Sequence, residues 1–187
     1  PWIKDIDVYR CPRGRPGHAT TYSAVIAANG MLVEGTYWPD SEQGVSQWDA
    51  VGKRVGSTVL RLTKLTDIVS PGAAQRALFI DIGQTAESRS FYVPYLHPYW
   101  PWISVPPLRH DHGTTLSMAD GHVEYWKWKG RETLNLPREL IPTRNDYTLE
   151  LLQGGDHEPR TEDGLHDLQR VQRATWGRLG YSAEGGP

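Results

Sequence analysis

Residues 109–129 constrain the fold of this chain most strongly, because their sequence is typical of a β-hairpin. Asp120-Gly121 can supply the two positive-φ residues of a type I′ turn, the tightest link between antiparallel strands. A two-residue loop places Met118 opposite Val123, and side chains then alternate between the two faces. The predicted core face carries Leu116, Met118, Val123 and Tyr125. The predicted opposite face carries Thr115, Ser117, Ala119, His122, Glu124 and Trp126.

Histidines and carboxylates gather on this hairpin, which holds three of the seven histidines in the chain. The candidate metal ligands are His110, His112, His122, Asp120 and Glu124. The imidazoles suit zinc with one position left open for water, whereas the carboxylates suit calcium. Asp120 in a tight turn also bonds nearby backbone groups, and His110 can donate to a backbone carbonyl or to Asp120. The pattern therefore leaves a structural role, metal binding and catalysis open.

The spacing within the hairpin resembles a known signature. His110, nine intervening residues and Asp120-Gly121 match the H-x9-D-G pattern of the prepilin-type processing-associated domain family, and Arg109 and residues 122–124 extend the match. The resemblance implies that His110, Asp120 and Gly121 are signature residues. It also implies a pseudopilin-like protein with a type IV prepilin leader, a hydrophobic N-terminal helix and a β-rich C-terminal domain.

Shorter similarities to the same family lie outside the hairpin. Residues 10–12, Arg-Cys-Pro, resemble the Cys-Pro pair that follows the hydrophobic helix in related proteins. Residues 65–71 resemble a Leu-x-x-Ile-x-x-Pro segment that precedes a strand. Thr115 and Met118 depart from the family, which often has asparagine and an aromatic residue at these two positions.

The function that the resemblance implies is structural. The chain would be the globular head of an exported protein, located at the cell surface, in the periplasm or outside the cell, and membrane-anchored when complete. Its partners would be other pilin-like subunits or secretion-apparatus proteins of a type II secretion or type IV pilus-like filament. Because the sequence starts at Pro1 and contains no apolar run of membrane-spanning length, we expect the leader and hydrophobic helix to be missing from it.

Composition limits the other classes of function. The length of 187 residues suits one domain over 1–187, and the net charge of −2 favours neither a nucleic-acid nor an anionic-membrane partner. The single cysteine, Cys11, cannot form an internal disulfide and fits a small buried residue. The sequence contains no phosphate-binding glycine loop, nucleophile elbow or zinc-protease motif, so no enzyme class or certain cofactor is indicated.

Aromatic residues suggest an alternative function. Residues 91–107 contain five prolines, which exclude a helix or a central strand. The candidate binding surface consists of Tyr95, Tyr99, Trp100, Trp102, Trp126 and Trp128. These rings either clamp a loop onto the core or form a platform for a sugar ring or a partner. The second reading describes a secreted carbohydrate-binding or carbohydrate-active protein, with a polysaccharide partner and a role for a histidine-bound metal.

The remaining segments complete an α+β prediction, in which an antiparallel sheet holds the central hairpin and is joined by long loops and a C-terminal helix. Strands are predicted at 22–28, 58–62 and 77–82, with a short strand or an extended lead-in at 6–10. The segment 77–82 is nearly all apolar, which predicts burial on both faces. Its Asp81 must then lie at the strand end or be hydrogen-bonded, because an unpaired buried carboxylate is costly.

The C-terminal part is predicted to contain the clearest helix, over 165–179, because its apolar residues fall on one stripe. Asp163 is the candidate N-cap and Gly180 the stop, and residues 181–187 form a tail. Pro137 and Pro142 predict that residues 130–142 are irregular.

Overall fold

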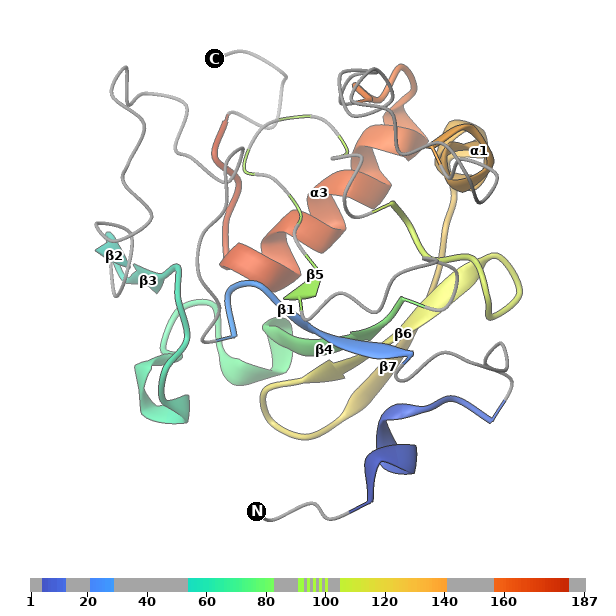
Figure 1. Cartoon of the computed structure of the whole chain (residues 1–187). Helices are drawn as coiled ribbons and strands as arrows, with labels where there is room; N and C mark the ends of the chain where they lie inside the picture. The colour runs from blue at the N-terminus through green and yellow to red at the C-terminus, as the bar shows by residue number, and fades with distance from the viewer. Residues whose placement is uncertain are drawn as a thin grey trace, which may run out of the picture.

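The structure is a computed structural model that describes residues 5–12, 21–28, 54–82, 91–92, 105–140 and 157–181, together with residues 94, 96, 98 and 100. It has the predicted α+β architecture, with a sheet covered on one face by a C-terminal helix (Figure 1). The sequence predicts a long excursion with little regular structure over 30–57; residues 30–53 of it lie outside the described residues, and its end contains the short strand β2 (Arg54–Val55). The segment 147–152, predicted as helix or strand, and the tail from residue 182 also lie outside the described residues.

Among the described residues, five strands form the main sheet in the order β5-β1-β4-β6-β7. Their bounds are β1 Tyr22–Val25, β4 Ala77–Asp81, β5 Phe91–Tyr92, β6 Gly113–Met118 and β7 Val123–Lys127. The pairs β1–β4, β4–β6 and β6–β7 are antiparallel, whereas β5 pairs with β1 in parallel. The predicted strands at 22–28 and 77–82 are confirmed, each ending earlier than expected.

The hairpin forms, but the predicted register is wrong by one residue. Val123 pairs with Ser117, and the loop has three residues, 119–121, closed by a bond from the Met118 N–H to the His122 carbonyl (2.9 Å). Gly121 has φ 96°, so its predicted positive φ is confirmed, while Asp120 is not among the positive-φ residues. A turn followed by a left-handed glycine is the common three-residue hairpin with a bulge.

A one-residue slip moves every side chain of one strand to the opposite face. Val123 and Tyr125, predicted to be in the core, are 68% and 49% exposed. Trp126, predicted on the polar face, is instead buried on the helix-facing side. The burial of indole rings therefore selects the longer loop over the tighter one.

The helix α3 (Glu162–Trp176) covers one face of the sheet, and its apolar residues join those of the strands in one core. Thr161 caps the helix by accepting from the Gly164 N–H (3.1 Å), and Gly177 ends it at φ 79°. The helix was correctly predicted, but the expected bounds, with Asp163 as the cap and Gly180 as the stop, lie too far along the chain. Among the described residues, no helix has the length and apolar character needed to cross a membrane.

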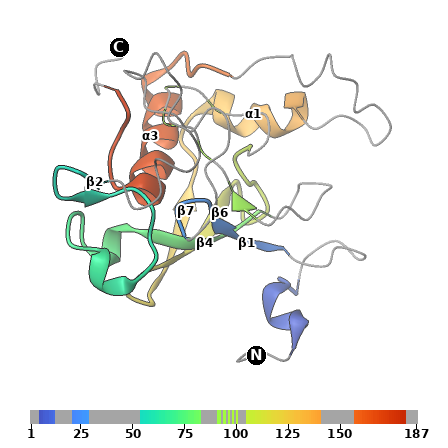
Figure 2. The same cartoon turned by 60° about the vertical axis from the view of Figure 1, so that its left-hand side comes forward.

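The helix α1 (Arg131–Leu140) contradicts the prediction that 130–142 is irregular. It lies beside the N-terminal end of α3 (Figures 1 and 2). Buried Asp167 of α3 accepts from the Gly130 N–H just before α1 (2.8 Å), and Glu132 of α1 accepts from the Thr161 N–H just before α3 (3.0 Å). These carboxylates satisfy amides that a helix start otherwise leaves unpaired, which local sequence cannot reveal.

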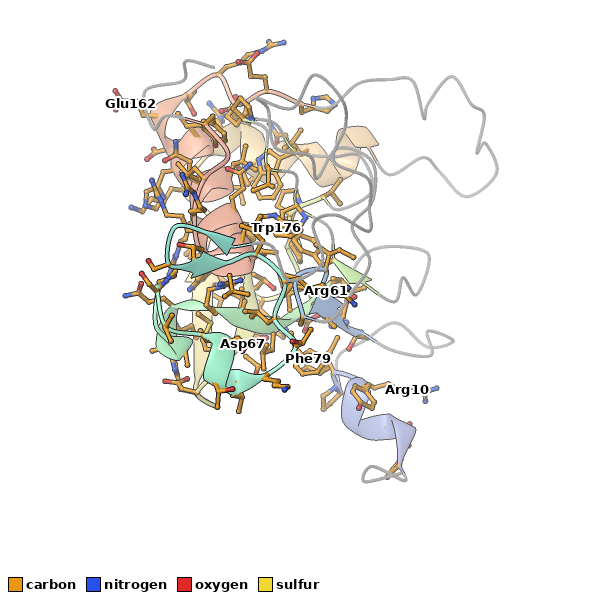
Figure 3. All side chains as sticks on the ribbon, turned by 90° about the vertical axis from the view of Figure 1, so that its left-hand side faces the viewer. Arg10, Arg61, Asp67, Phe79, Glu162 and Trp176 are labelled. Carbon is orange, nitrogen blue, oxygen red and sulfur yellow. The ribbon has the colours of Figure 1, made fainter. Side chains whose placement is uncertain are left out.

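The other face of the sheet is only partly covered. The short 3-10 helix η1 (Ile6–Tyr9), found where a short strand or an extended lead-in was predicted, lies on the side of the sheet away from α3 (Figure 1). Phe79 of β4 also faces this side and is 40% exposed, so the prediction that 77–82 is buried on both faces is wrong (Figure 3).

The shorter elements lie beside the sheet and carry a second small core. They are β2 (Arg54–Val55), β3 (Thr58–Val59), η2 (Leu65–Asp67) and η3 (Ala73–Gln75). Arg76, fully buried, joins this region to α3 by donating to the Val59 carbonyl (2.7 Å) and the Thr175 carbonyl (3.0 Å).

Candidate functional site

The open end of the β6–β7 hairpin, residues 109–113, is attached to the last residue of β4. Asp81 is buried there, and its carboxylate accepts from Arg109 at Oδ1 and lies 2.7 Å from His110 Nε2 at Oδ2. Thr114 Oγ1 donates to the Asp81 carbonyl (2.9 Å). Both expectations for Asp81, a strand end and hydrogen bonding, are confirmed. The signature histidine therefore contacts Asp81 and not the turn aspartate, Asp120.

The N-terminal segment adds a thiol to this group. Cys11 is buried as predicted, and its backbone N–H donates to Thr21 Oγ1 (2.6 Å). One ligand atom each from Cys11, Asp81 and His110 lies within 4.8 Å of the other two. Sequence reasoning did not connect these residues, because they come from three segments separated by long stretches of chain. The sequence offered one signal for this link: Cys11 and His110 both lie in segments that resemble the H-x9-D-G family.

Tyr22 of β1 completes the group, since it pairs with Asp81 across the sheet. Burial raises the pKa of the Tyr22 hydroxyl, and the Asp81 carboxylate and the Cys11 thiol raise it further. The phenol therefore stays protonated near neutral pH. We name Cys11, Tyr22, Asp81, Arg109 and His110 the thiol–imidazole cluster.

The loop that delivers Arg109 and His110 has an unusual backbone. Asp111 and His112 have φ values of 46° and 62°, in the left-handed region that few residues other than glycine adopt. Tyr125 Oη donates to the His110 carbonyl (2.9 Å), and the Trp128 N–H donates to the His112 carbonyl (3.1 Å). These bonds hold the chain reversal at residues 111–112 in place, and the His112 side chain is exposed to solvent.

The turn end of the hairpin, residues 118–124, holds a separate polar group. His122 Nδ1 lies 2.6 Å from Asp120 Oδ1, and His122 Nε2 lies 3.1 Å from Glu124 Oε1. Glu124 also accepts from Trp126 Nε1. We name Asp120, His122 and Glu124 the turn triad.

Each group of the turn triad stabilises the charged form of its neighbours. The hydrogen bond to Glu124, then the one to Asp120, raises the pKa of His122. The backbone hydrogen bond from His122 lowers the pKa of Asp120, and the hydrogen bond from Trp126 lowers that of Glu124. Because the triad is largely solvent-exposed, these interactions have small energetic consequences.

The metal site predicted from His110, His112, His122, Asp120 and Glu124 is not assembled. The six-residue strand β6 separates the open end from the turn end by about 20 Å at roughly 3.3 Å per residue. His110 and His112 therefore cannot share an ion with His122. In the turn triad each ring nitrogen of His122 faces a different carboxylate, which places the two carboxylates on opposite edges of the ring.

The predicted aromatic surface is also contradicted where the structure describes it. Trp100, Trp126 and Trp128 are 1%, 4% and 4% exposed, so they are core residues. Trp100 and Trp128 pack edge to face with ring centroids 6.1 Å apart, and Arg170 of α3 lies 3.9 Å from the centre of the Trp126 ring. Tyr95, Tyr99 and Trp102 lie outside the described residues.

Comparisons of the chain with protein-family models, with curated proteins and with solved structures found no match. The likeness to the H-x9-D-G family therefore rests on the residues of this chain.

Proposed function

We propose that the chain is the globular head of an exported, pseudopilin-like protein that assembles with pilin-like subunits or secretion-apparatus proteins. The observation that carries the proposal is the structural use of the signature. His110 is bonded to buried Asp81 at one end of the hairpin, and Gly121 adopts the left-handed conformation that closes the other end. Signature residues whose contacts hold a hairpin in a sheet fit a structural role, as in an assembly component.

The partly covered face of the sheet supports the same proposal. Phe79, Val123 and Tyr125 are exposed, and each belongs to a strand whose opposite face packs on the core. Exposed apolar side chains on a rigid sheet are typical of surfaces that contact other proteins. The alternative, a carbohydrate-binding surface of Trp and Tyr, has no such support, because its three described members are buried.

The test is made with the full-length protein in the cells that encode it. A photo-crosslinking amino acid replaces Tyr125, and mass spectrometry of the adducts identifies the neighbours. Pilin-like or secretion-apparatus subunits in the envelope fraction are the expected adducts. The same replacement at Leu65, which is exposed but lies in η2 away from the sheet face, is the matched control. Recovery of the protein in the cytoplasm, without such adducts from Tyr125, would contradict the proposal.

A further inference from the structure

We propose that Cys11, Asp81 and His110 form a binding site for one zinc ion. The three residues offer a thiol sulfur, a carboxylate oxygen and an imidazole nitrogen that all lie within 4.8 Å of one another. Zinc binds these three donor types at about 2.0–2.3 Å, which corresponds to donor atoms roughly 3–4 Å apart around a tetrahedral ion. The spacing already present is thus close to the one that the ion requires.

The chain positions the three donors before any ion arrives. Asp81 ends a central strand, His110 belongs to the reversal held by Tyr125, and the backbone of Cys11 is held by Thr21. Bringing such donors together from distant segments costs conformational entropy, and here the fold has already met that cost.

Burial and exposure at the site suit a three-residue centre. Cys11 and Asp81 are buried, whereas the His110 side chain is 28% exposed. The exposed edge of His110 gives an ion a route from solvent, and we expect a water molecule as the fourth ligand. Three protein ligands with one open position are the arrangement of zinc sites that keep a solvent ligand.

Charge and supporting hydrogen bonds also match zinc. A Cys11 thiolate and the Asp81 carboxylate would supply two negative charges to the ion, with neutral His110 as the third donor. Arg109 holds Asp81 through Oδ1, and Asp81 Oδ2 lies 2.7 Å from His110 Nε2, so an ion bound by both donors would replace this direct contact. Hydrogen-bonded carboxylate ligands are common around zinc. The sulfur donor disfavours calcium and magnesium, which prefer oxygen ligands.

The proposed site differs from the turn triad in a way that an experiment can use. The triad also contains a histidine and carboxylates, but its donors do not converge, and it contains no sulfur. Because Cys11 is the only cysteine of the chain, any metal–thiolate signal must come from it.

The experiment uses the folded chain purified under reducing conditions without chelator. Zinc is measured by metal analysis and calorimetry, and cobalt replaces it for spectroscopy. We expect one zinc per chain, and for cobalt the near-ultraviolet charge-transfer band of a metal-bound thiolate. Cys11→Ser should remove this band and weaken zinc binding by at least about 100-fold, since even changes around the ligands cost roughly 10- to 100-fold.

His122→Ala is the matched control and should keep both the band and the affinity. Circular dichroism confirms that each variant is folded before binding is measured. The proposal is overturned if folded wild-type protein binds no stoichiometric zinc, if Cys11→Ser binds as tightly as wild type, or if His122→Ala abolishes binding. Because no partner protein is involved, these outcomes are independent of the assembly role proposed above.

Discussion

The two ends of the β6–β7 hairpin carry the same kinds of side chain in opposite environments. At the open end the Asp81 side chain is fully buried against Arg109 and His110, whereas at the turn end the side chains of Asp120 and His122 are 40% and 41% exposed. An aspartate–histidine contact is thus part of the interior in one place and a solvated surface pair in the other. The contrast teaches that burial, more than the identity of the pair, decides what such a contact contributes.

Removing the buried charge of Asp81 is the most direct test of this difference between the two ends. Asp81→Asn leaves Arg109 buried without its counter-charge, and two further guanidinium nitrogens of Arg109 already lack hydrogen-bond partners among the described residues. We expect a loss of about 3–5 kcal/mol in the free energy of unfolding. Denaturant unfolding with a chelator present measures this without a contribution from metal. A loss for Asp120→Asn as large as that for Asp81→Asn would contradict the contrast.

The glycine at the open end should be the next most sensitive position. A Cβ on Gly113 would lie 2.2 Å from the Trp126 carbonyl oxygen and 2.9 Å from the Tyr125 ring. Gly113→Ala must therefore push β7 away from β6, at a cost of about 2–3 kcal/mol. Thermal or denaturant unfolding checks the value. Gly72→Ala, where no atom lies within 4 Å of the added Cβ, is the control and should be nearly neutral.

The glycine at the turn end should cost less, and for a different reason. A Cβ on Gly121 meets nothing within 4 Å, so the penalty comes only from its φ of 96°. Gly121→Ala should cost about 1–2 kcal/mol. Gly121→Asn should recover part of this loss in the same unfolding assay, because asparagine tolerates the left-handed region better. Equal stability of the two variants would show that the strain lies elsewhere.

The smallest expected effect is the pH dependence that the turn triad gives to the free energy of unfolding. The pKa of His122 is raised in the folded chain, so its charged form favours folding. This contribution is fully present below its unfolded pKa of about 6.5 and disappears as pH rises through the higher folded value. The lowered pKa values of Asp120 and Glu124 keep both carboxylates charged throughout that window.

Unfolding of wild type and His122→Ala, compared at about pH 5.5 and about pH 8.5, tests this sign. The wild-type advantage should be small, larger at the lower pH and nearly absent at the higher one. An NMR titration of His122 should give a midpoint above its ordinary value. An advantage that grows with pH would reverse the assignment.

The sequence predicted the features that depend on neighbouring residues. The hairpin at 109–129, the positive φ of Gly121 and the helix near the C-terminus follow from turn chemistry and apolar periodicity. The expectation that Asp81 is hydrogen-bonded also held, since it needs only the cost of an unpaired buried carboxylate.

Tertiary structure decided what local patterns leave open. Asp-Gly is compatible with both two-residue and three-residue loops, and the burial of Trp126 and Trp128 chose the longer one, which turned Val123 and Tyr125 outward. The carboxylate of Asp167, distant in sequence, supports the start of a helix that Pro137 argued against. The meeting of Cys11 with His110 likewise required the sheet to bring remote segments together. Local sequence determines which backbone conformations have low free energy, and the burial of large side chains and charges selects among them.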